Sequence, residues 1–133
     1  MPQNPDLLAT KTVAGTVCIF DRTKHASNPI DDVVKPQITL RGHSKEGYGL
    51  AWNPTDGGKG HILSASEDTT VCHWCDPFFR LKFPVSYRPY RDVNAYSKAN
   101  SIMEPLAVYK GHTAIVEAGL HLIQTDPIAD AKV

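Results

Sequence analysis

The sequence predicts an all-β repeat protein, and three observations carry this prediction. A short β-type segment at Thr16–Asp21 returns later in the chain as Thr70–Trp74. An apolar run precedes each copy, Leu7–Thr10 before the first and Ile62–Ala65 before the second. A Gly-His pair follows each copy later in the chain, Gly42-His43 after the first and Gly111-His112 after the second. Short strands that recur in this way indicate small sheets, which cannot bury their own faces without neighbouring repeats. Folds of this kind are typically binding platforms rather than catalysts.

The first strand pair is predicted at Leu7–Lys11 and Val17–Phe20. Val13-Ala14-Gly15 separates these runs, and its glycine can adopt the positive φ that a tight hairpin needs. The next segment, Thr23–Pro36, contains two prolines and an Asp pair and is therefore predicted as a surface loop. A brief strand at Gln37–Leu40 follows and ends at the first Gly-His pair.

A second group of strands begins at Tyr48–Trp52, which Asn53-Pro54 and a glycine-rich turn close. The next two strands, His61–Ser66 and Thr70–Trp74, flank Glu67-Asp68-Thr69. The Asp side chain of that turn can bond its own backbone and tighten the hairpin.

The strand order of the repeat predicts a β-propeller. Leu106–Tyr109 leads into the second Gly-His pair just as Ile38–Leu40 leads into the first, which makes four short strands per unit. Asn4-Pro5 repeats the Asn-Pro pair that closes the strand at Trp52. Residues 1–5 are therefore expected to be the end of a first strand.

Composition excludes several classes of function. The chain has 133 residues, long enough for one domain, and its 14 Lys and Arg balance its 14 Asp and Glu. Without a net positive field we expect no direct DNA binding and no attachment to an anionic membrane. No apolar run approaches the roughly 20 residues of a membrane span, and Met1–Asn4 lacks the features of a signal peptide. The expected location is the cytosol or the nucleus.

The cysteines suggest packing rather than chemistry. Cys18 and Cys72 occupy the same position of the repeat, as expected for small buried strand residues in a reducing compartment. Cys72 and Cys75 form a Cys-x-x-Cys, which offers two thiolates to zinc or a redox pair. No second Cys pair or well-spaced His accompanies it. A small metal or redox protein therefore stays an alternative, and the structural interpretation is favoured.

No catalytic motif is present. The sequence has no glycine-rich phosphate loop, no nucleophile elbow and no zinc-protease helix. His43 and His112 each follow a glycine in a repeat, which favours structural hydrogen bonding over metal ligation or general-base catalysis. We therefore expect no enzyme activity, no metal and no cofactor.

The repeat resembles a known family. Gly42-His43, followed by Ser66-x-Asp68-x-Thr70-Val71-x-x-Trp74, looks like a WD40 repeat. In that family a His, a turn Asp, a strand Ser or Thr and the Trp form a buried hydrogen-bonded tetrad. The resemblance implies that His43, Asp68, Trp74 and either Ser64 or Ser66 hold these places.

Longer strings resemble one branch, the histone-binding retinoblastoma-associated WD40 family. Its members are subunits of chromatin assembly factor, of type B histone acetyltransferase and of deacetylase and Polycomb complexes. The resemblance covers most of residues 1–74 and 92–117, and the string Lys45–Pro54 is its most specific part. Complete relatives have seven blades, whereas this chain is expected to hold an all-β propeller fragment of about two to three.

Two departures from the family pattern stand out. Cys75 follows Trp74 where Asp is expected, and joining Trp74 to Asp92 would restore Trp-Asp-Val. Residues 75–91 are therefore hypothesised to be a retained intron or another splice-derived insertion, because a blade strand has no reason to carry three prolines. Its basic part, Arg80–Arg91, is predicted as an exposed loop rather than a nucleic-acid arm. Beyond residue 117 the resemblance fades.

The functional candidates follow the Gly-His pairs, at the rim where a blade begins. The resemblance implies that Glu46, Tyr48 and Glu117 take the basic tail of histone H3 or similar Arg- and Lys-rich peptides. A carboxylate accepts charge-assisted hydrogen bonds from such peptides, and a tyrosine ring packs on their side chains. The alternative for Glu46 and Tyr48 is a solvated rim charge and a packing aromatic, and for Glu117 this alternative is favoured. The family's histone H4 surface uses an N-terminal helix and a late loop, which these 133 residues lack.

These observations predict three blade segments: a partial blade at 1–41, an interrupted blade at 42–110 and the start of a third at 111–133. The predicted function is a non-enzymatic nuclear scaffold, present also in the cytoplasm. It binds histones H3 and H4 and other chromatin-complex subunits. The alternatives are a WD40 adaptor for another peptide, such as a ubiquitin-ligase substrate receptor, and a truncated product without function. An incomplete propeller leaves an open sheet edge, so instability is expected of the isolated chain.

Overall fold

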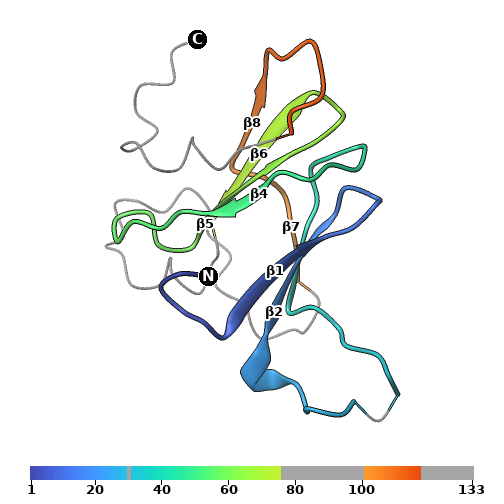
Figure 1. The fold of residues 1–133 in the computed structure, drawn as a ribbon, viewed down its shortest axis with the longest axis vertical. Helices are drawn as coiled ribbons and strands as arrows, with labels where there is room; N and C mark the ends of the chain where they lie inside the picture. Colours follow the sequence, from blue (N-terminus) through green and yellow to red (C-terminus); the bar gives the residue numbers. More distant parts are fainter. Residues whose placement is uncertain (30, 76–100, 118–133) are drawn as a thin grey trace.

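The computed structural model describes residues 1–29, 31–75 and 101–117 of the chain. Within these ranges eight strands form two four-stranded sheets, and one short 3-10 helix follows the second strand. The first sheet occupies the lower part of the view in Figure 1 and the second sheet the upper part. The prediction of an all-β propeller fragment is confirmed. Within the described ranges no helix has the length and hydropathy that crossing a membrane requires.

The first sheet has the order β1-β2-β3-β7. Its strands are β1 (Leu7–Lys11), β2 (Val17–Asp21), β3 (Ile38–Leu40) and β7 (Ser101–Met103). The first three are antiparallel neighbours, whereas β7 runs parallel to β3, with Thr39 opposite Ile102. The helix η1 (Arg22–Lys24) begins after Asp21, whose side chain accepts a hydrogen bond from the Thr23 amide. A strand from late in the sequence therefore belongs to the first sheet.

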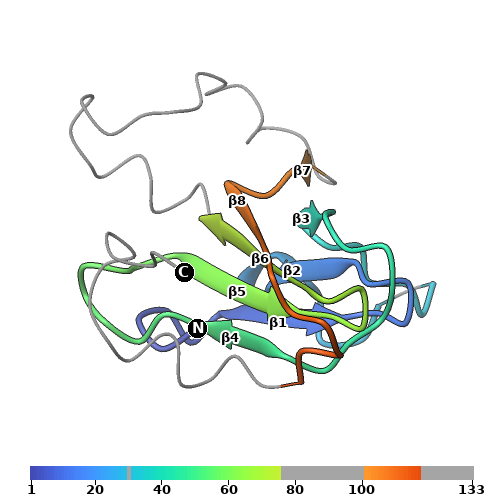
Figure 2. The ribbon, with the colours of Figure 1, turned by 90° about the horizontal axis from the view of Figure 1, so that it is seen from above.

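The second sheet is an antiparallel meander with the order β4-β5-β6-β8. Its strands are β4 (Leu50–Trp52), β5 (His61–Ala65), β6 (Thr70–Cys75) and β8 (Ala107–Lys110). Figure 2 shows β4, β5 and β6 as neighbouring strands, with β1 and β2 beside them. Seven predicted strands agree with the observed ones apart from shifts of one or two residues at their ends. The largest shift is at β4, which starts at Leu50 rather than at Tyr48. The expectation that residues 1–5 end a first strand is wrong, because these residues form turns before β1, and β7 was not predicted.

The hydrophobic core lies between the two sheets. Because successive side chains of a strand point to opposite faces, each sheet sends every second residue into this layer. The buried members are Val17, Ile19, Ile38 and Leu40 from the first sheet and Ile62, Cys72 and Trp74 from the second. A smaller cluster on the other face of the second sheet contains Leu63, Ala65 and Val71. Both faces of the second sheet therefore bury apolar side chains.

Both hairpins close with the same turn. The Thr12 amide donates to the Thr16 carbonyl in the first hairpin, and the Ser66 amide donates to the Thr70 carbonyl in the second. Each turn places its fourth residue at positive φ, which is 81° for Gly15 and 68° for Thr69. A β-branched residue adopts this left-handed conformation only at an energetic cost, which glycine avoids. The second turn is therefore the strained copy.

Replacing Thr69 by Gly should raise the free energy of unfolding by about 0.5–1 kcal/mol, because glycine relieves the left-handed strain. The converse change, Gly15→Thr, should destabilise the chain by more than this amount. A Cβ at position 15 would lie 2.3 Å from the Lys45 carbonyl oxygen, so strain and a clash add. Urea unfolding of the two variants measures both effects. Equal effects of opposite sign would contradict the packing part of this prediction.

Candidate functional site

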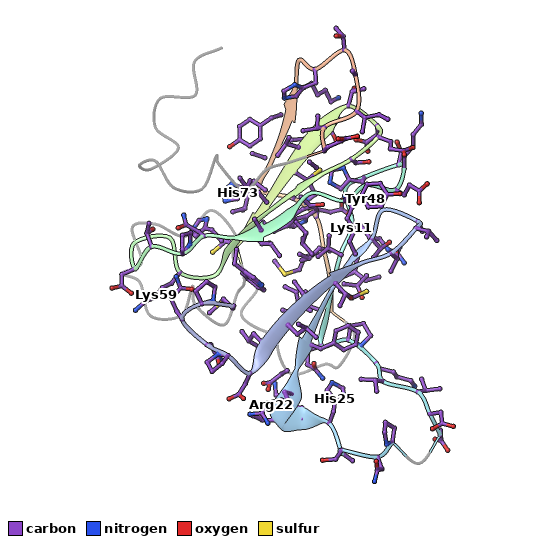
Figure 3. All side chains as sticks on the ribbon, in the orientation of Figure 1. Lys11, Arg22, His25, Tyr48, Lys59 and His73 are labelled. Carbon is purple, nitrogen blue, oxygen red and sulfur yellow. The ribbon has the colours of Figure 1, made fainter. Side chains whose placement is uncertain are left out.

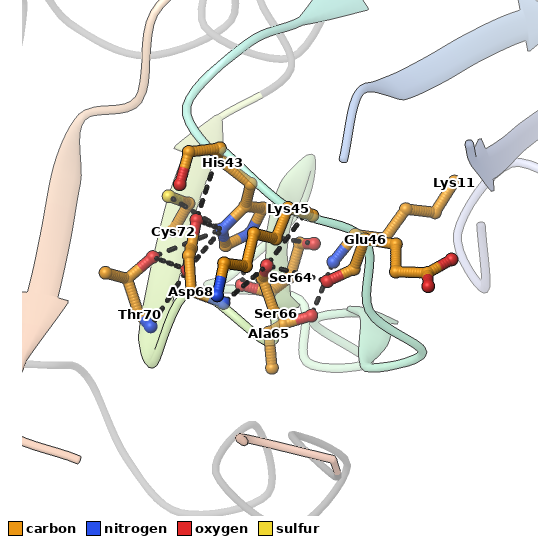
Figure 4. Close-up of polar contacts among 11 residues, drawn as sticks. Lys11, His43, Lys45, Glu46, Ser64, Ala65, Ser66, Asp68, Thr70 and Cys72 are labelled. Atoms are coloured by element: carbon orange, nitrogen blue, oxygen red, sulfur yellow. Dashed lines mark hydrogen bonds and ion pairs between the residues drawn. The ribbon is translucent and has the colours of Figure 1, made fainter. Parts of the chain in front are cut away.

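The centre of the second sheet is a hydrogen-bond network around His43, whose side chain is fully buried. Its Nδ1 lies 3.2 Å from Asp68 Oδ2 and 3.2 Å from Thr70 Oγ1. Its Nε2 lies 3.1 Å from Ser64 Oγ and 3.0 Å from the Ser64 carbonyl oxygen. Figure 4 shows these contacts between the segment before β4 and the hairpin of β5 and β6. The ring therefore joins the entry of the sheet to its two central strands.

Asp68 is the second hub of this network. Its carboxylate accepts hydrogen bonds from the Ser44 amide at 2.8 Å, the Thr70 amide at 3.0 Å and Thr70 Oγ1 at 2.6 Å. Burial by itself raises the pKa of a carboxyl group. Here the bonds from Thr70 and Ser44 and the nearby His43 outweigh burial and lower the pKa of Asp68 to about 2. The carboxylate therefore stays ionised throughout the physiological range.

The His43 ring is neutral near pH 7. Burial lowers its pKa, and the positive charge of Lys11 lowers it further, which Asp68 offsets only in part. An ionised carboxylate can only accept hydrogen bonds, so it favours the tautomer whose Nδ1 carries the proton. Nε2 then accepts from the Ser64 hydroxyl, and only the protonated ring donates to the Ser64 carbonyl oxygen, which also partly offsets the lowering of the pKa. With both nitrogens occupied and no exposed surface, the ring has no atom available to a substrate.

Trp74 joins the group through its ring rather than through a hydrogen bond. The His43 and Trp74 ring centroids are 5.9 Å apart and the ring planes meet at 70°, an edge-to-face contact. The indole Nε1 is buried and, within the described residues, has no hydrogen-bond partner. A Cβ at Gly42 would lie 3.0 Å from the Trp74 ring and 3.1 Å from Cys72 Sγ. Gly42 is therefore the residue that lets His43 approach the sheet.

The structure distinguishes the two serines that the sequence left open. Ser64 contacts His43, whereas the Ser66 hydroxyl donates to the backbone carbonyls of Lys45 at 2.9 Å and Glu46 at 2.8 Å. Sequence reasoning missed two further members of the network, Ser44 and Thr70. A signal for Thr70 exists, because a threonine two residues after a turn Asp commonly bonds its carboxylate. The Ser44 amide contact depends on tertiary packing and has no such signal.

The predicted rim residues lie where the chain enters the second sheet. A Cβ at Gly47 would lie 2.5 Å from the Ala65 carbonyl oxygen, and one at Gly49 would lie 2.7 Å from the Ala65 Cβ. Both glycines therefore pack tightly against β5. Because alternate residues of an extended segment point to opposite sides, Glu46 and Tyr48 point away from β5. Tyr48 is 80% exposed, and Glu46 is partly exposed.

Glu117 lies beside this segment. Its carbonyl oxygen is 3.3 Å from the position that a Cβ at Gly49 would take, and the neighbouring Val116 amide donates to the Ser66 carbonyl at 3.4 Å. Its side chain is exposed. The three predicted rim residues therefore share one end of the second sheet, and whether they bind a ligand stays a prediction.

Lys11 completes this end of the molecule, and sequence reasoning missed it. Its Nζ crosses from the end of β1 to the carbonyl oxygen of Ala65 on β5, and it lies 3.1 Å from the Gly47 Cβ position. Figure 3 shows Lys11 and Tyr48 near each other, at mid-height of the view. Burial lowers the pKa of Lys11, against the opposing effect of Asp68. No signal in the sequence points to this contact, because it depends on how the two sheets pack.

The cysteines do not converge on a metal site. Cys72 and Cys75 lie three residues apart on β6, so their side chains point to opposite faces of the sheet. Within the described ranges no group of three His, Cys, Asp or Glu side chains is arranged to hold a metal ion. Burial raises the pKa of Cys18 and of Cys72, which keeps these thiols protonated and unreactive.

Some predictions fall outside the described residues. Of the hypothesised insertion at 75–91, the structure describes Cys75 alone, which ends β6, is buried and stands opposite His61. The basic part of that segment and the chain after Glu117 lie outside the described residues. The splice hypothesis stays a prediction.

Comparisons with known proteins agree with the sequence resemblance. No protein-family model matches the chain. Over 117 residues it is 51% identical to "Histone acetyltransferase type B subunit 2" of Mycosarcoma maydis, a match that covers 87% of the chain and 23% of the relative. The chain thus spans about a quarter of the length of the curated relative it matches.

Two solved structures are also similar. A chain in the crystal structure of a mitotic checkpoint complex superposes with a TM-score of 0.49 at 21% identity, over 84% of this chain and 24% of that one. The β-propeller domain of Myceliophteria thermophila Cps50 (Swd1) superposes with a TM-score of 0.38 at 34% identity. That match covers 53% of this chain and 18% of the other.

Replacing Asp68 by Asn should lower the free energy of unfolding by about 2–3 kcal/mol, because an amide cannot replace the charged acceptor of three hydrogen bonds. Urea unfolding of the full chain measures the loss. Asp56→Asn is the matched control, since the Asp56 side chain is 90% exposed and should change stability by less than about 0.5 kcal/mol. Equal effects of the two changes would show that the network does not stabilise the fold.

Stability should fall in two steps as the solution is acidified. The pKa of His43 is lower in the folded chain than its ordinary 6.5, so the unfolded chain binds that proton first and the native state loses stability as pH falls below 6.5. Asp68 acts likewise between 3.8, its ordinary value, and about 2. Urea midpoints measured across this range test both steps. His43→Gln should reduce the upper step and Asp68→Asn the lower one, and unchanged profiles would contradict the assignment.

Proposed function

Over the residues matched, this chain belongs to the WD40-repeat family of histone acetyltransferase type B subunit 2, and from that membership we propose that it is a non-enzymatic, histone-binding scaffold of chromatin-modifying complexes. The observation that carries the proposal is the 51% identity to a protein named as a subunit of a histone acetyltransferase. The proposed location is the nucleus, with a cytoplasmic fraction. The proposed partners are histones H3 and H4 and other subunits of such complexes.

The geometry of the rim supports binding of a basic peptide. Glu46 precedes the exposed Tyr48 by two residues on a segment whose glycines pack inward against β5, and the backbone of Glu117 lies beside Gly49 of that segment. Carboxylates accept charge-assisted hydrogen bonds from Lys and Arg, and the ring can pack on their alkyl stems or cationic groups. We assign the N-terminal tail of histone H3 to this rim.

A non-enzymatic role is supported by how the strongest polar groups are used. His43 and Asp68 have shifted pKa values, a common feature of catalytic groups. Here both side chains are more than nine-tenths buried, and their polar atoms bond Ser44, Ser64 and Thr70. The shifts therefore reflect a structural network. The rim, rather than this network, is the surface available to a partner.

A fluorescently labelled H3 N-terminal peptide should bind the full chain, and Glu46→Gln and Tyr48→Ala should each weaken binding about fivefold. That factor corresponds to about 1 kcal/mol, as expected for an exposed ion pair or cation–π contact. Fluorescence anisotropy measures the dissociation constant, and binding should weaken further as salt is added.

Asp56→Asn is the control for this experiment, because Asp56 is an exposed acidic residue in the loop at the other end of β5. It should leave the affinity unchanged. If the peptide fails to bind, or if all three variants bind equally well, the histone assignment is wrong. A WD40 adaptor for a different peptide would then be the better account.

A further inference from the structure

The loop between β4 and β5 contains an Asp-Gly pair, Asp56-Gly57. The Asp56 side chain is 90% exposed, and Gly57 is exposed as well. Figure 3 labels Lys59 of this loop, at the left of the view. An Asp that precedes Gly can close a cyclic imide through the next backbone nitrogen, because glycine has no Cβ to hinder the approach of that nitrogen. The pair is therefore a candidate for chemical modification of the backbone.

Hydrogen bonds hold the residues on either side of the pair. Asn53 Oδ1 accepts from the Thr55 amide at 2.9 Å and from the Thr55 hydroxyl at 2.8 Å. The Gly58 amide donates to the Thr55 carbonyl oxygen at 3.2 Å. The Gly57 amide, by contrast, has no hydrogen-bond partner within the residues that the structure describes. Its nitrogen is therefore available to react.

The surroundings of Gly57 leave the backbone room to rotate. Apart from its chain neighbours, no atom lies within 4 Å of the position that a Cβ at Gly57 would take. At Gly58 a Cβ would lie 2.0 Å from Asn53 Nδ2, so packing restrains that residue. Lys59 Nζ lies 3.1 Å from Asp56 Oδ1, but an ion pair between exposed side chains is weak. In the described part of the chain, neither packing nor a strong contact keeps the Asp56 carboxyl group from the Gly57 nitrogen.

The other Asn and Asp residues in the described ranges lack this combination. Each Asn precedes a proline, whose nitrogen carries no hydrogen. These residues are Asn4, Asn28 and Asn53. Three Asp residues precede an amide that is already hydrogen-bonded to a backbone carbonyl, and these are Asp6, Asp21 and Asp68. Asp31 and Asp32 precede residues with side chains, Asp32 and Val33, which hinder the approach of the nitrogen.

We propose that Asp56-Gly57 is a site of spontaneous isomerisation, which converts Asp56 to isoaspartate. The Gly57 nitrogen forms a bond to the Asp56 carboxyl carbon, and the carboxyl hydroxyl group leaves with the Gly57 amide hydrogen as water. Water then adds to one of the two carbonyl groups of the cyclic imide. Breaking the bond between the nitrogen and the main-chain carbonyl carbon of Asp56 gives isoaspartate, and breaking the new bond restores Asp56. The water lost in the first step is regained in the second, so no other reactant is consumed.

The product changes the loop rather than the rim. The chain now runs through the side chain of residue 56, which lengthens the loop backbone by one carbon atom and leaves a free α-carboxylate. The hydrogen bond from the Gly58 amide to the Thr55 carbonyl spans this position, so isomerisation should disrupt that turn. Glu46 and Tyr48 lie at the other end of β5, and the proposal does not depend on what they bind.

The test incubates the purified full chain at physiological temperature and follows isomerisation over time. Trypsin releases residues 46–59, and chromatography with electron-transfer fragmentation separates and identifies the isoaspartate form, which has an unchanged mass. A purified L-isoaspartyl methyltransferase, which methylates the free α-carboxylate, gives an independent measure. Isoaspartate should accumulate at position 56. A sample digested at the start of the incubation corrects for isomerisation during digestion.

Gly57→Ala should slow the accumulation at least about tenfold, because the added methyl group hinders the attacking nitrogen. This variant should fold normally, since its Cβ meets open space and Gly57 is not among the residues with positive φ. The tryptic peptide that contains Asp31 and Asp32 is the internal control, and it should show at least about tenfold less isoaspartate.

A synthetic peptide with the sequence of residues 46–59 measures the rate without the fold. A rate in the full chain within about tenfold of the peptide rate would support the proposal, and a slower rate would show that the fold protects the pair. Absence of isoaspartate at position 56, equal amounts at positions 31 or 32, or an equal rate in the Gly57→Ala variant would each overturn the proposal.

Discussion

The buried ion-dipole network of Asp68 and His43 is the interaction on which the second sheet depends. The carboxylate bonds the hairpin turn and the entry segment, and the imidazole carries the connection on to β5. A charge removed from water is tolerated only when its bonds are satisfied, and here three donors and one imidazole satisfy it. Because an unpaired buried carboxylate would be unfavourable, the bonds to Asp68 determine the path of the chain from Gly42 to the hairpin.

That path also determines what the surface presents. Asp68 and the Ser66 hydroxyl hold the segment that enters the second sheet, residues 44–49, and Gly47 and Gly49 of this segment pack tightly against β5. The alternation of an extended chain then directs Glu46 and Tyr48 outward. Glu46 and Tyr48 are thus positioned by a network whose centre, the His43 side chain, is fully buried. Loss of the network would affect the rim indirectly, through the backbone that carries it.

The two copies of the repeat show how one strand pattern is held in different ways. Ala14 stands in the first turn where Asp68 stands in the second, so the first hairpin has no carboxylate hub. It is instead held by the shared core, by Lys11 reaching the Ala65 carbonyl and by β7 pairing with β3. Each sheet therefore depends on the other for part of its stability, as expected of repeats that bury their faces against neighbours.

The sequence by itself determined every strand except β7, the hairpins, the repeat and the family, because alternation, turn residues and short motifs are local properties. It also named His43, Asp68 and Trp74 as neighbours, although only through a family resemblance. Tertiary structure alone decided the contacts between distant segments. These are the choice of Ser64 over Ser66, the bond from the Ser44 amide, the reach of Lys11 and the pairing of β7 with β3. Such contacts depend on how the two sheets pack and on which backbone groups lack a partner within their own strand pair. No local sequence pattern predicts either property.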